Sequence, residues 1–156
     1  MTIEAFAALV ARVTQRVAGR PLDAVLAQEL NSAMPGDGAA VAEIAEACRN
    51  GIAAGWMCNR EAAGIRYGRV LKPGPATHDF SVDVVDMNDV AGPRHRHPNG
   101  EIDLVLPVSP GARFDGHGAG WVVYGPESVH RPTVTGGRAL VLYLLPQGAI
   151  DFAPPG

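Results

Sequence analysis

The sequence has little cysteine, no excess of basic charge and no long apolar run. Its two cysteines, Cys48 and Cys58, form no CxxC pair, so we expect neither a disulfide framework nor a thiolate zinc site. Thirteen basic residues stand against sixteen acidic ones, and a net charge of -3 gives no basic surface for nucleic acid or an anionic membrane. No stretch reaches the length of a membrane span. The first residues include acidic Glu4 and lack the basic residues with which a signal peptide begins. We therefore expect a cytoplasmic protein that contacts neither membranes nor nucleic acid.

Apolar residues recur at helical spacing in the first third of the chain. The pattern predicts a helix over residues 3–17, a second helix that Pro21 opens and that ends near Leu30, and a third over residues 39–54. Their apolar stripes need burial, either against the rest of the fold or across a homodimer interface. Residues 1–55 are therefore expected to form an N-terminal helical segment.

The apolar period changes to two from Ile65 onward. Strands are expected at 65–71, 80–86, 101–108, 120–124 and 139–145, each bounded by turns that contain glycine or proline. Several short strands at such spacing favour an antiparallel sandwich or barrel. At 156 residues the chain is long enough for one domain with a real core, so we expect residues 56–156 to form a β-barrel in one compact unit with the helices.

The most informative stretch is Gly92-Pro-Arg-His-Arg-His-Pro-Asn-Gly-Glu101. His95 and His97 are separated by one residue, so on a strand both side chains point to the same face. The Pro-Asn-Gly turn lets Glu101 swing back toward them, and His130 follows one hairpin and strand later. Three imidazoles and a carboxylate predict a site for one divalent ion of iron, manganese, zinc or nickel. The alternative is a solvated loop with an exposed glutamate.

The same stretch resembles the first motif of the cupin superfamily, a histidine pair followed by a glutamate on the next strand. The stretch from Gly120 through Pro126 to His130 resembles the second motif, although its proline-to-histidine spacing differs by one residue and no glycine follows the proline. The resemblance implies a mainly β fold, a cupin-type jelly-roll barrel after an N-terminal helical segment, with the metal inside the barrel near one mouth.

Other residues are candidates for substrate binding and proton transfer. Arg60, Arg66 and Arg69 lie where the helices meet the barrel, and one of them could clamp a substrate carboxylate. Tyr124, like Trp121, could stack on a planar ligand, although core packing is the more ordinary role for both aromatics.

Asp103 shares strand parity with Glu101, so both carboxylates are candidate catalytic groups. The alternative for Asp103 is a charge at the barrel mouth. Arg94 and Arg96 alternate with the histidines and should face away from the metal, and we expect His78 and His117 to lie in turns and to bind no metal.

Several segments resemble the bacterial family of 4-hydroxylaminobenzoate lyases from about residue 50 to the C-terminus. They include Gly55-Trp-Met-Cys-Asn-Arg-Glu61, Phe80-Ser-Val-Asp-Val-Val85, His97-Pro-Asn-Gly-Glu-Ile-Asp103, Gly111-Ala-Arg-Phe-Asp-Gly116 and His130-Arg-Pro-Thr133. The resemblance implies a lyase that converts 4-hydroxylaminobenzoate and water into 3,4-dihydroxybenzoate (protocatechuate) and ammonia during nitrobenzoate degradation. In that reaction the metal would polarise an oxygen, Glu101 or Asp103 would move protons, and an arginine would hold the carboxylate.

The atoms of this reaction balance without an oxidant, because the hydroxylamine nitrogen is reduced while the ring is oxidised. No glycine fingerprint for NAD or flavin is present, so we expect neither cofactor. Two other functions stay open: an oxygen-consuming cupin dioxygenase that acts on an aromatic substrate, and a cupin that binds an aromatic acid without turnover.

Overall fold

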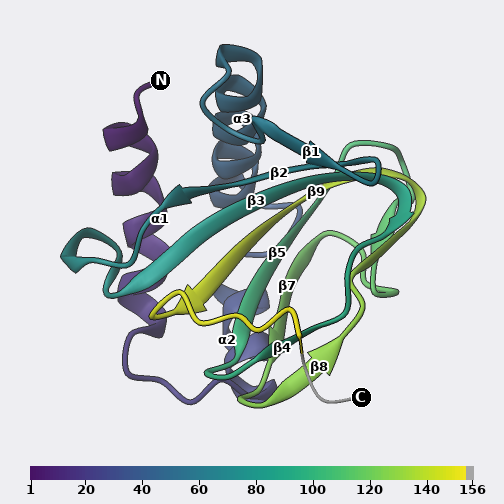
Figure 1. Cartoon of the computed structure of the whole chain (residues 1–156). Coiled ribbons are helices and arrows are strands. Elements are labelled where there is room, and N and C mark those ends of the chain that lie inside the picture. The colour runs from purple at the N-terminus through teal and green to yellow at the C-terminus, as the bar shows by residue number, and fades with distance from the viewer. Residues whose placement is uncertain (154–156) are drawn as a thin grey trace.

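The computed structural model describes residues 1–153 as three helices followed by antiparallel β structure (Figure 1). The helices are α1 Ile3–Val17, α2 Ala24–Ala33 and α3 Ala39–Ala54. The strands are β1 Arg60–Ala62, β2 Ile65–Leu71, β3 Phe80–Ala91, β4 His95–His97, β5 Glu101–Pro107, β6 Arg113–Phe114, β7 Gly120–Tyr124, β8 Ser128–His130 and β9 Thr133–Pro146. A short 3-10 helix, η1 Pro75–Thr77, precedes β3. Within these described residues, no helix is long and apolar enough to cross a membrane.

Local capping explains where the helices begin and end. The first and third helices have the predicted bounds, and α3 ends at Gly55, whose φ of 87° is the left-handed conformation that glycine adopts readily. The prediction for the second helix was wrong at both ends, because α2 starts at Ala24 and continues to Ala33. Its N-cap is Asp23, whose carboxylate accepts a hydrogen bond of 3.0 Å from the Leu26 N–H.

The strands form one large sheet and one small sheet, and every pairing is antiparallel. The large sheet has the order β1-β2-β3-β9-β5-β7, with β6 also paired to β9, and the small sheet pairs β4 with β8. All five predicted strands are present. Two are longer than predicted, since β3 continues to Ala91 and β9 begins at Thr133, and both pass an irregularity between Asn88 and Val90. The C-terminal end of β3 and the N-terminal end of β9 curve toward β8 in Figure 1.

The large sheet is apolar on both faces. One face, with Val84, Leu104 and Leu142, packs against the helices in a cluster that includes Phe6 and Val13 of α1. The other face, with Val105 and Val141 among its residues, packs with Phe114 and Val134 in a second cluster. Because side chains alternate along β5, Ile102 and Leu104 face the helices whereas Glu101 and Asp103 face the second cluster.

Most of the predicted helix stripes are buried within the chain, although Ile3 of α1 and Val25 of α2 are 39% and 56% exposed. Phe6, Val17 and Cys48 are 0% exposed, and they pack on the sheet. The structure confirms the mainly β fold class expected from the sequence, with antiparallel sheets after an N-terminal helical segment, and helices and strands share one apolar cluster.

Candidate metal centre

The small sheet brings the three predicted histidine ligands onto one ribbon. In its register His95 lies opposite His130, and His97 lies opposite Ser128. The turn after β4 then returns the chain to the start of β5, with the Gly100 N–H donating to the His97 carbonyl at 3.2 Å. Gly100 has a φ of 86°, and a Cβ there would lie 2.7 Å from both Leu22 Cδ2 and the Tyr124 carbonyl oxygen. Glycine is therefore required at this position to place Glu101 beneath the histidines.

The four predicted ligands converge at one point. One donor atom from each of His95, His97, Glu101 and His130 lies within 4.8 Å of the other three. The Nε2 atoms of His95 and His130 are 3.1 Å apart, and His97 Nε2 is 3.1 Å from Glu101 Oε2. His95 is 2% exposed, whereas His97 and Glu101 are fully buried.

Each imidazole is held by its outer nitrogen. His95 Nδ1 is 3.2 Å from the Pro93 carbonyl oxygen, and His130 Nδ1 is 2.6 Å from Asp115 Oδ2. Ser128 Oγ donates to the Gly125 carbonyl at 2.6 Å, so it accepts from His97 Nδ1 at 2.9 Å. Since all three partners are acceptors, Nδ1 carries the proton and Nε2 presents a lone pair to the centre.

The inner atoms lack ordinary partners. His97 Nε2, both Glu101 carboxyl oxygens and both Asp103 carboxyl oxygens are buried and have no hydrogen-bond partner within residues 1–153. Buried lone pairs and a buried carboxylate are costly unless something compensates them. Donors about 2.1 Å from one ion and at right angles would lie about 3.0 Å apart. The donor set and its spacing therefore fit a first-row divalent cation.

Asp103 is fully buried one pleat further along the same face of β5, not at an exposed mouth. Burial, followed by the neighbouring charge of Glu101, raises the pKa of the Asp103 carboxyl well above its usual range. Burial also lowers the pKa of His95, although Glu101 opposes that effect. Glu101 and Asp103 are thus two buried carboxyls on one face of β5, and Glu101 is the one that contacts the histidines.

Asp115 is a part of the site that sequence reasoning missed. Its Oδ2 accepts from the Tyr124 hydroxyl at 2.5 Å as well as from His130, and its Oδ1 accepts from the Thr133 N–H at 2.9 Å. Burial alone would raise the pKa of Asp115, but these hydrogen bonds lower it below its usual value. The ring of Tyr124 lies 4.5 Å from that of His130, so this tyrosine borders the cluster, whereas Trp121 is in the core as expected.

Strand register separates the three candidate arginines. Arg66 pairs with Asp86 of β3. Asp86 is on the same face of β3 as Val84, and that face packs against the helices. Arg66 therefore lies on the opposite side of the sheet from Glu101. Arg69 lies on the same side as Glu101, because Arg69, Asp83, Tyr143 and Asp103 are successive cross-strand neighbours. Its guanidinium bonds Asp83 at 3.0 Å. Arg60 pairs with Tyr67 and so has the same parity as Arg69, on strand β1 at the sheet edge.

The last described residues lie against β4. Arg96 and Asp151 exchange two backbone hydrogen bonds of 2.8 and 2.9 Å, and the Arg96 guanidinium pairs with Asp151 and Glu127. The ring of Phe152 lies 5.5 Å from that of His95 and is 61% exposed. Arg96 thus faces away from the cluster, as predicted, and holds Asp151 and the following Phe152 beside it.

The two remaining histidines lie outside the cluster. His78 Nδ1 is 2.9 Å from Thr14 Oγ1 on α1, and His117 is in the turn after β6.

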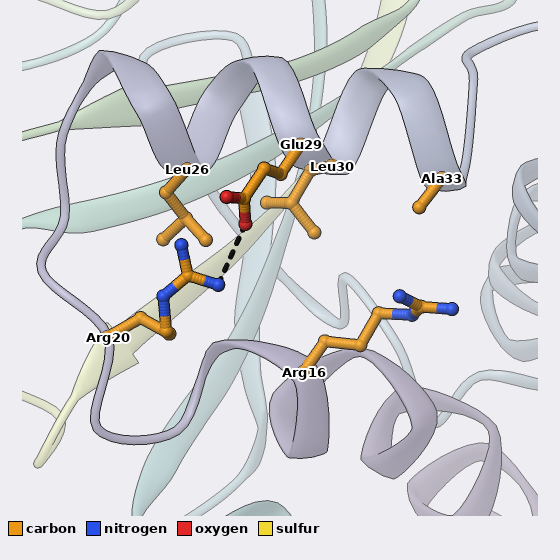
Figure 2. Close-up of a pocket in the computed structure, with 6 residues that line it drawn as sticks. All are labelled: Arg16, Arg20, Leu26, Glu29, Leu30 and Ala33. Carbon is orange, nitrogen blue, oxygen red and sulfur yellow. Dashed lines mark ion pairs between the residues drawn. The ribbon is translucent and has the colours of Figure 1, made fainter.

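A pocket of about 220 Å³ between α1 and α2 is separate from the histidine cluster. It is lined by Arg16, Arg20, Leu26, Glu29, Leu30 and Ala33 (Figure 2). Arg20 and Glu29 form an ion pair of 2.7 Å there.

The fold and the cluster define a mainly β protein with a candidate site for a divalent metal, at the histidine and glutamate positions that resemble the cupin motifs. The family model of PnbB, 4-hydroxylaminobenzoate lyase, matches residues 8–152, and the chain belongs to this family of lyases. A 4-hydroxylaminobenzoate lyase of Nocardioides sp. (strain LMS-CY) is 37% identical over 72% of this chain and 73% of the relative. One from Pseudomonas putida is 33% identical over 66% of this chain and 68% of the relative. The protein is thus an enzyme of the lyase class.

Two solved structures are similar over part of the chain. An RmlC-like cupin protein from Ralstonia eutropha JMP134 is 15% identical, with a TM-score of 0.42 over 55% of this chain and 57% of that one. Oxalate oxidase in complex with glycolate is 21% identical, with a TM-score of 0.45 over 60% of this chain and 57% of that one.

Proposed function

We propose that this chain converts 4-hydroxylaminobenzoate and water into 3,4-dihydroxybenzoate and ammonia, with a divalent metal held by His95, His97, Glu101 and His130. The observation that carries the proposal is the buried cluster of three imidazoles and one carboxylate in a member of this lyase family. The reaction needs no external oxidant, because reduction of the nitrogen balances oxidation of the ring. Neither NAD nor flavin takes part in it.

The buried carboxyls supply the proton transfers in this proposal. When bound, the metal ion supplies a Lewis acid that polarises the hydroxylamine oxygen or a water molecule. Cleavage of the N–O bond, addition of water to the ring and loss of ammonia each require a proton to move. Glu101 and Asp103 lie on one face of β5, both fully buried, and they are the groups we assign to carry those protons.

The aromatic ring and the carboxylate of the substrate require separate contacts. We assign the ring to Tyr124, which lies beside His97 and His130 with ring-centroid distances of 5.5 and 4.5 Å. Among the three candidate arginines, Arg69 is favoured for the carboxylate, because it shares the Glu101 side of the sheet and its side chain is 36% exposed. Arg60 has the same parity and is the next candidate.

Anaerobic turnover tests the proposal. Purified protein loaded with one metal at a time would be incubated with 4-hydroxylaminobenzoate, and ammonia and protocatechuate would be assayed. The proposal expects both products without oxygen. Turnover that requires and consumes oxygen would favour a dioxygenase, and binding of the aromatic acid without product would favour a binding protein.

We also propose that the enzyme works in the cytoplasm as a homodimer. Val25 on α2 is 56% exposed and Ile3 on α1 is 39% exposed, which leaves large apolar side chains on the helical segment for a second copy. Light scattering after size-exclusion chromatography would test the assembly, and the mass of one chain would contradict it.

A further inference from the structure

Asp115 joins three strands to the metal centre through one carboxylate. It lies in the turn between β6 and β7. Its Oδ2 accepts from Tyr124 at the end of β7 and from His130 at the end of β8, and its Oδ1 accepts from the first residue of β9, Thr133. Its own N–H donates to the Thr133 carbonyl at 2.8 Å, which fixes the turn itself.

From this geometry we propose that Asp115 is a positioning residue that sets the tautomer and the ring orientation of His130 for metal binding, and that fixes the hydroxyl of Tyr124. The inference rests on the metal site proposed above. Asp115 would not touch the metal, because its carboxylate contacts the Nδ1 side of the imidazole and the centre lies on the Nε2 side.

The tautomer follows from the acceptor character of a carboxylate. An ionised carboxylate has no proton to donate, so His130 must carry its proton on Nδ1 to make the 2.6 Å bond. Its Nε2 then carries a lone pair and lies 3.1 Å from His95 Nε2 and 3.7 Å from Glu101 Oε2. The Pro93 carbonyl and Ser128 do the same for the other two histidines, but Asp115 is the charged partner of the three. A charged acceptor makes the stronger bond.

The backbone of this turn offers a substitution that preserves the fold. Asp115 has a φ of 49°, a left-handed conformation that asparagine adopts about as readily as aspartate. In Asp115→Asn the single amide oxygen can keep the bond from the Thr133 N–H, and the amide NH2 then faces His130. His130 Nδ1 must accept from that NH2, so its proton moves to Nε2 and points into the centre. An imidazole in this tautomer has no lone pair for the metal.

The test compares wild-type protein, Asp115→Asn and the control His117→Ala. His117 is exposed in the same turn, and its backbone, not its ring, bonds Phe114. Long-range proton–nitrogen NMR of the metal-free proteins at about pH 8, above the ordinary histidine pKa, reports which ring nitrogen of His130 carries hydrogen. Competition for zinc against a chromophoric chelator reports affinity.

We expect Nδ1–H in wild type and in His117→Ala, and Nε2–H in Asp115→Asn, with zinc bound about 10- to 100-fold more weakly by Asp115→Asn alone. Wild-type affinity and an unchanged tautomer in Asp115→Asn would overturn this inference and leave the metal site standing. A wild-type His130 with its proton on Nε2 would overturn it even if the variant did not fold. Wild-type protein that takes up no zinc, iron, manganese or nickel would overturn the metal site, and this inference with it.

Discussion

Replacing Glu101 by glutamine should separate metal binding and chemistry from folding. Glutamine has nearly the same size as glutamate and the side chain is fully buried, so the substitution removes a charge and leaves the packing volume almost unchanged. The carboxylate oxygen that it alters lies 3.1 Å from His97 Nε2 and 3.7 Å from His130 Nε2. The amide that replaces the carboxylate also directs its NH2 donor toward the lone pair of His97 Nε2 or of His130 Nε2.

The size of the effect follows from the burial of the charge. Removing one partner of a buried charged cluster costs about 3–5 kcal/mol. Since about 1.4 kcal/mol is a tenfold change, metal affinity should fall by at least about 100-fold. Turnover should be lost as well, because Glu101 is assigned both to the metal and to proton transfer. Glu43→Gln is the matched control, because Glu43 is 55% exposed on α3 and its pair with Arg12 contributes at most about 1 kcal/mol.

Two measurements on Glu101→Gln are needed. Competition against a chelator gives its metal affinity, and ammonia release under anaerobic conditions with metal in large excess gives its turnover. If the variant holds a full complement of metal and turns over at a near-normal rate, Glu101 is neither an essential ligand nor the proton carrier, and the assigned roles are wrong.

The other predictions concern the metal, the thiols, the helices and the arginines. Metal at about 1,000 times its dissociation constant should add about 4 kcal/mol of stability and raise Tm by roughly 10 °C in a thermal melt, whereas an unchanged Tm would speak against a site in the folded protein. Burial raises the pKa values of Cys48 and Cys58 to about 12, so neither thiol should react with a disulfide reagent at neutral pH until the protein is unfolded; rapid reaction of the folded protein would contradict their burial. Deleting residues 1–30 should expose the helix-facing side of the sheet and cause aggregation, and a soluble, fully active truncation would refute this. Arg69→Ala should raise KM with little change in kcat, and should raise it more than Arg66→Ala does; the opposite order would favour Arg66.

Short-range pattern was enough to predict the first three members of the cluster. The alternation of a strand puts His95 and His97 on one face, and the turn before Glu101 returns the chain beside them. His130 required the motif order in addition, because its place depends on the pairing of β8 with β4. The role of Asp115 could not be predicted, since it depends on how a turn meets β7, β8 and β9 in space.

The errors in strand and helix bounds also have local causes. Gly136 and Gly137 have positive φ values and suggest a turn, yet they lie within β9, which begins at Thr133. The strand predicted from the sequence therefore begins at residue 139, whereas β9 begins at Thr133. At α2, Pro21 predicts an earlier start, but the helix begins where the side chain of Asp23 caps it.

Turnover as a function of metal occupancy tests the central claim most directly. Chelator-stripped protein would be titrated anaerobically with its metal from zero to one ion per chain, and ammonia and protocatechuate would be measured at each step from 4-hydroxylaminobenzoate. We predict that both products appear in a one-to-one ratio and rise in proportion to occupancy until one ion is bound. Full turnover by metal-free protein, or no product at full occupancy without oxygen, would contradict a metal-dependent lyase.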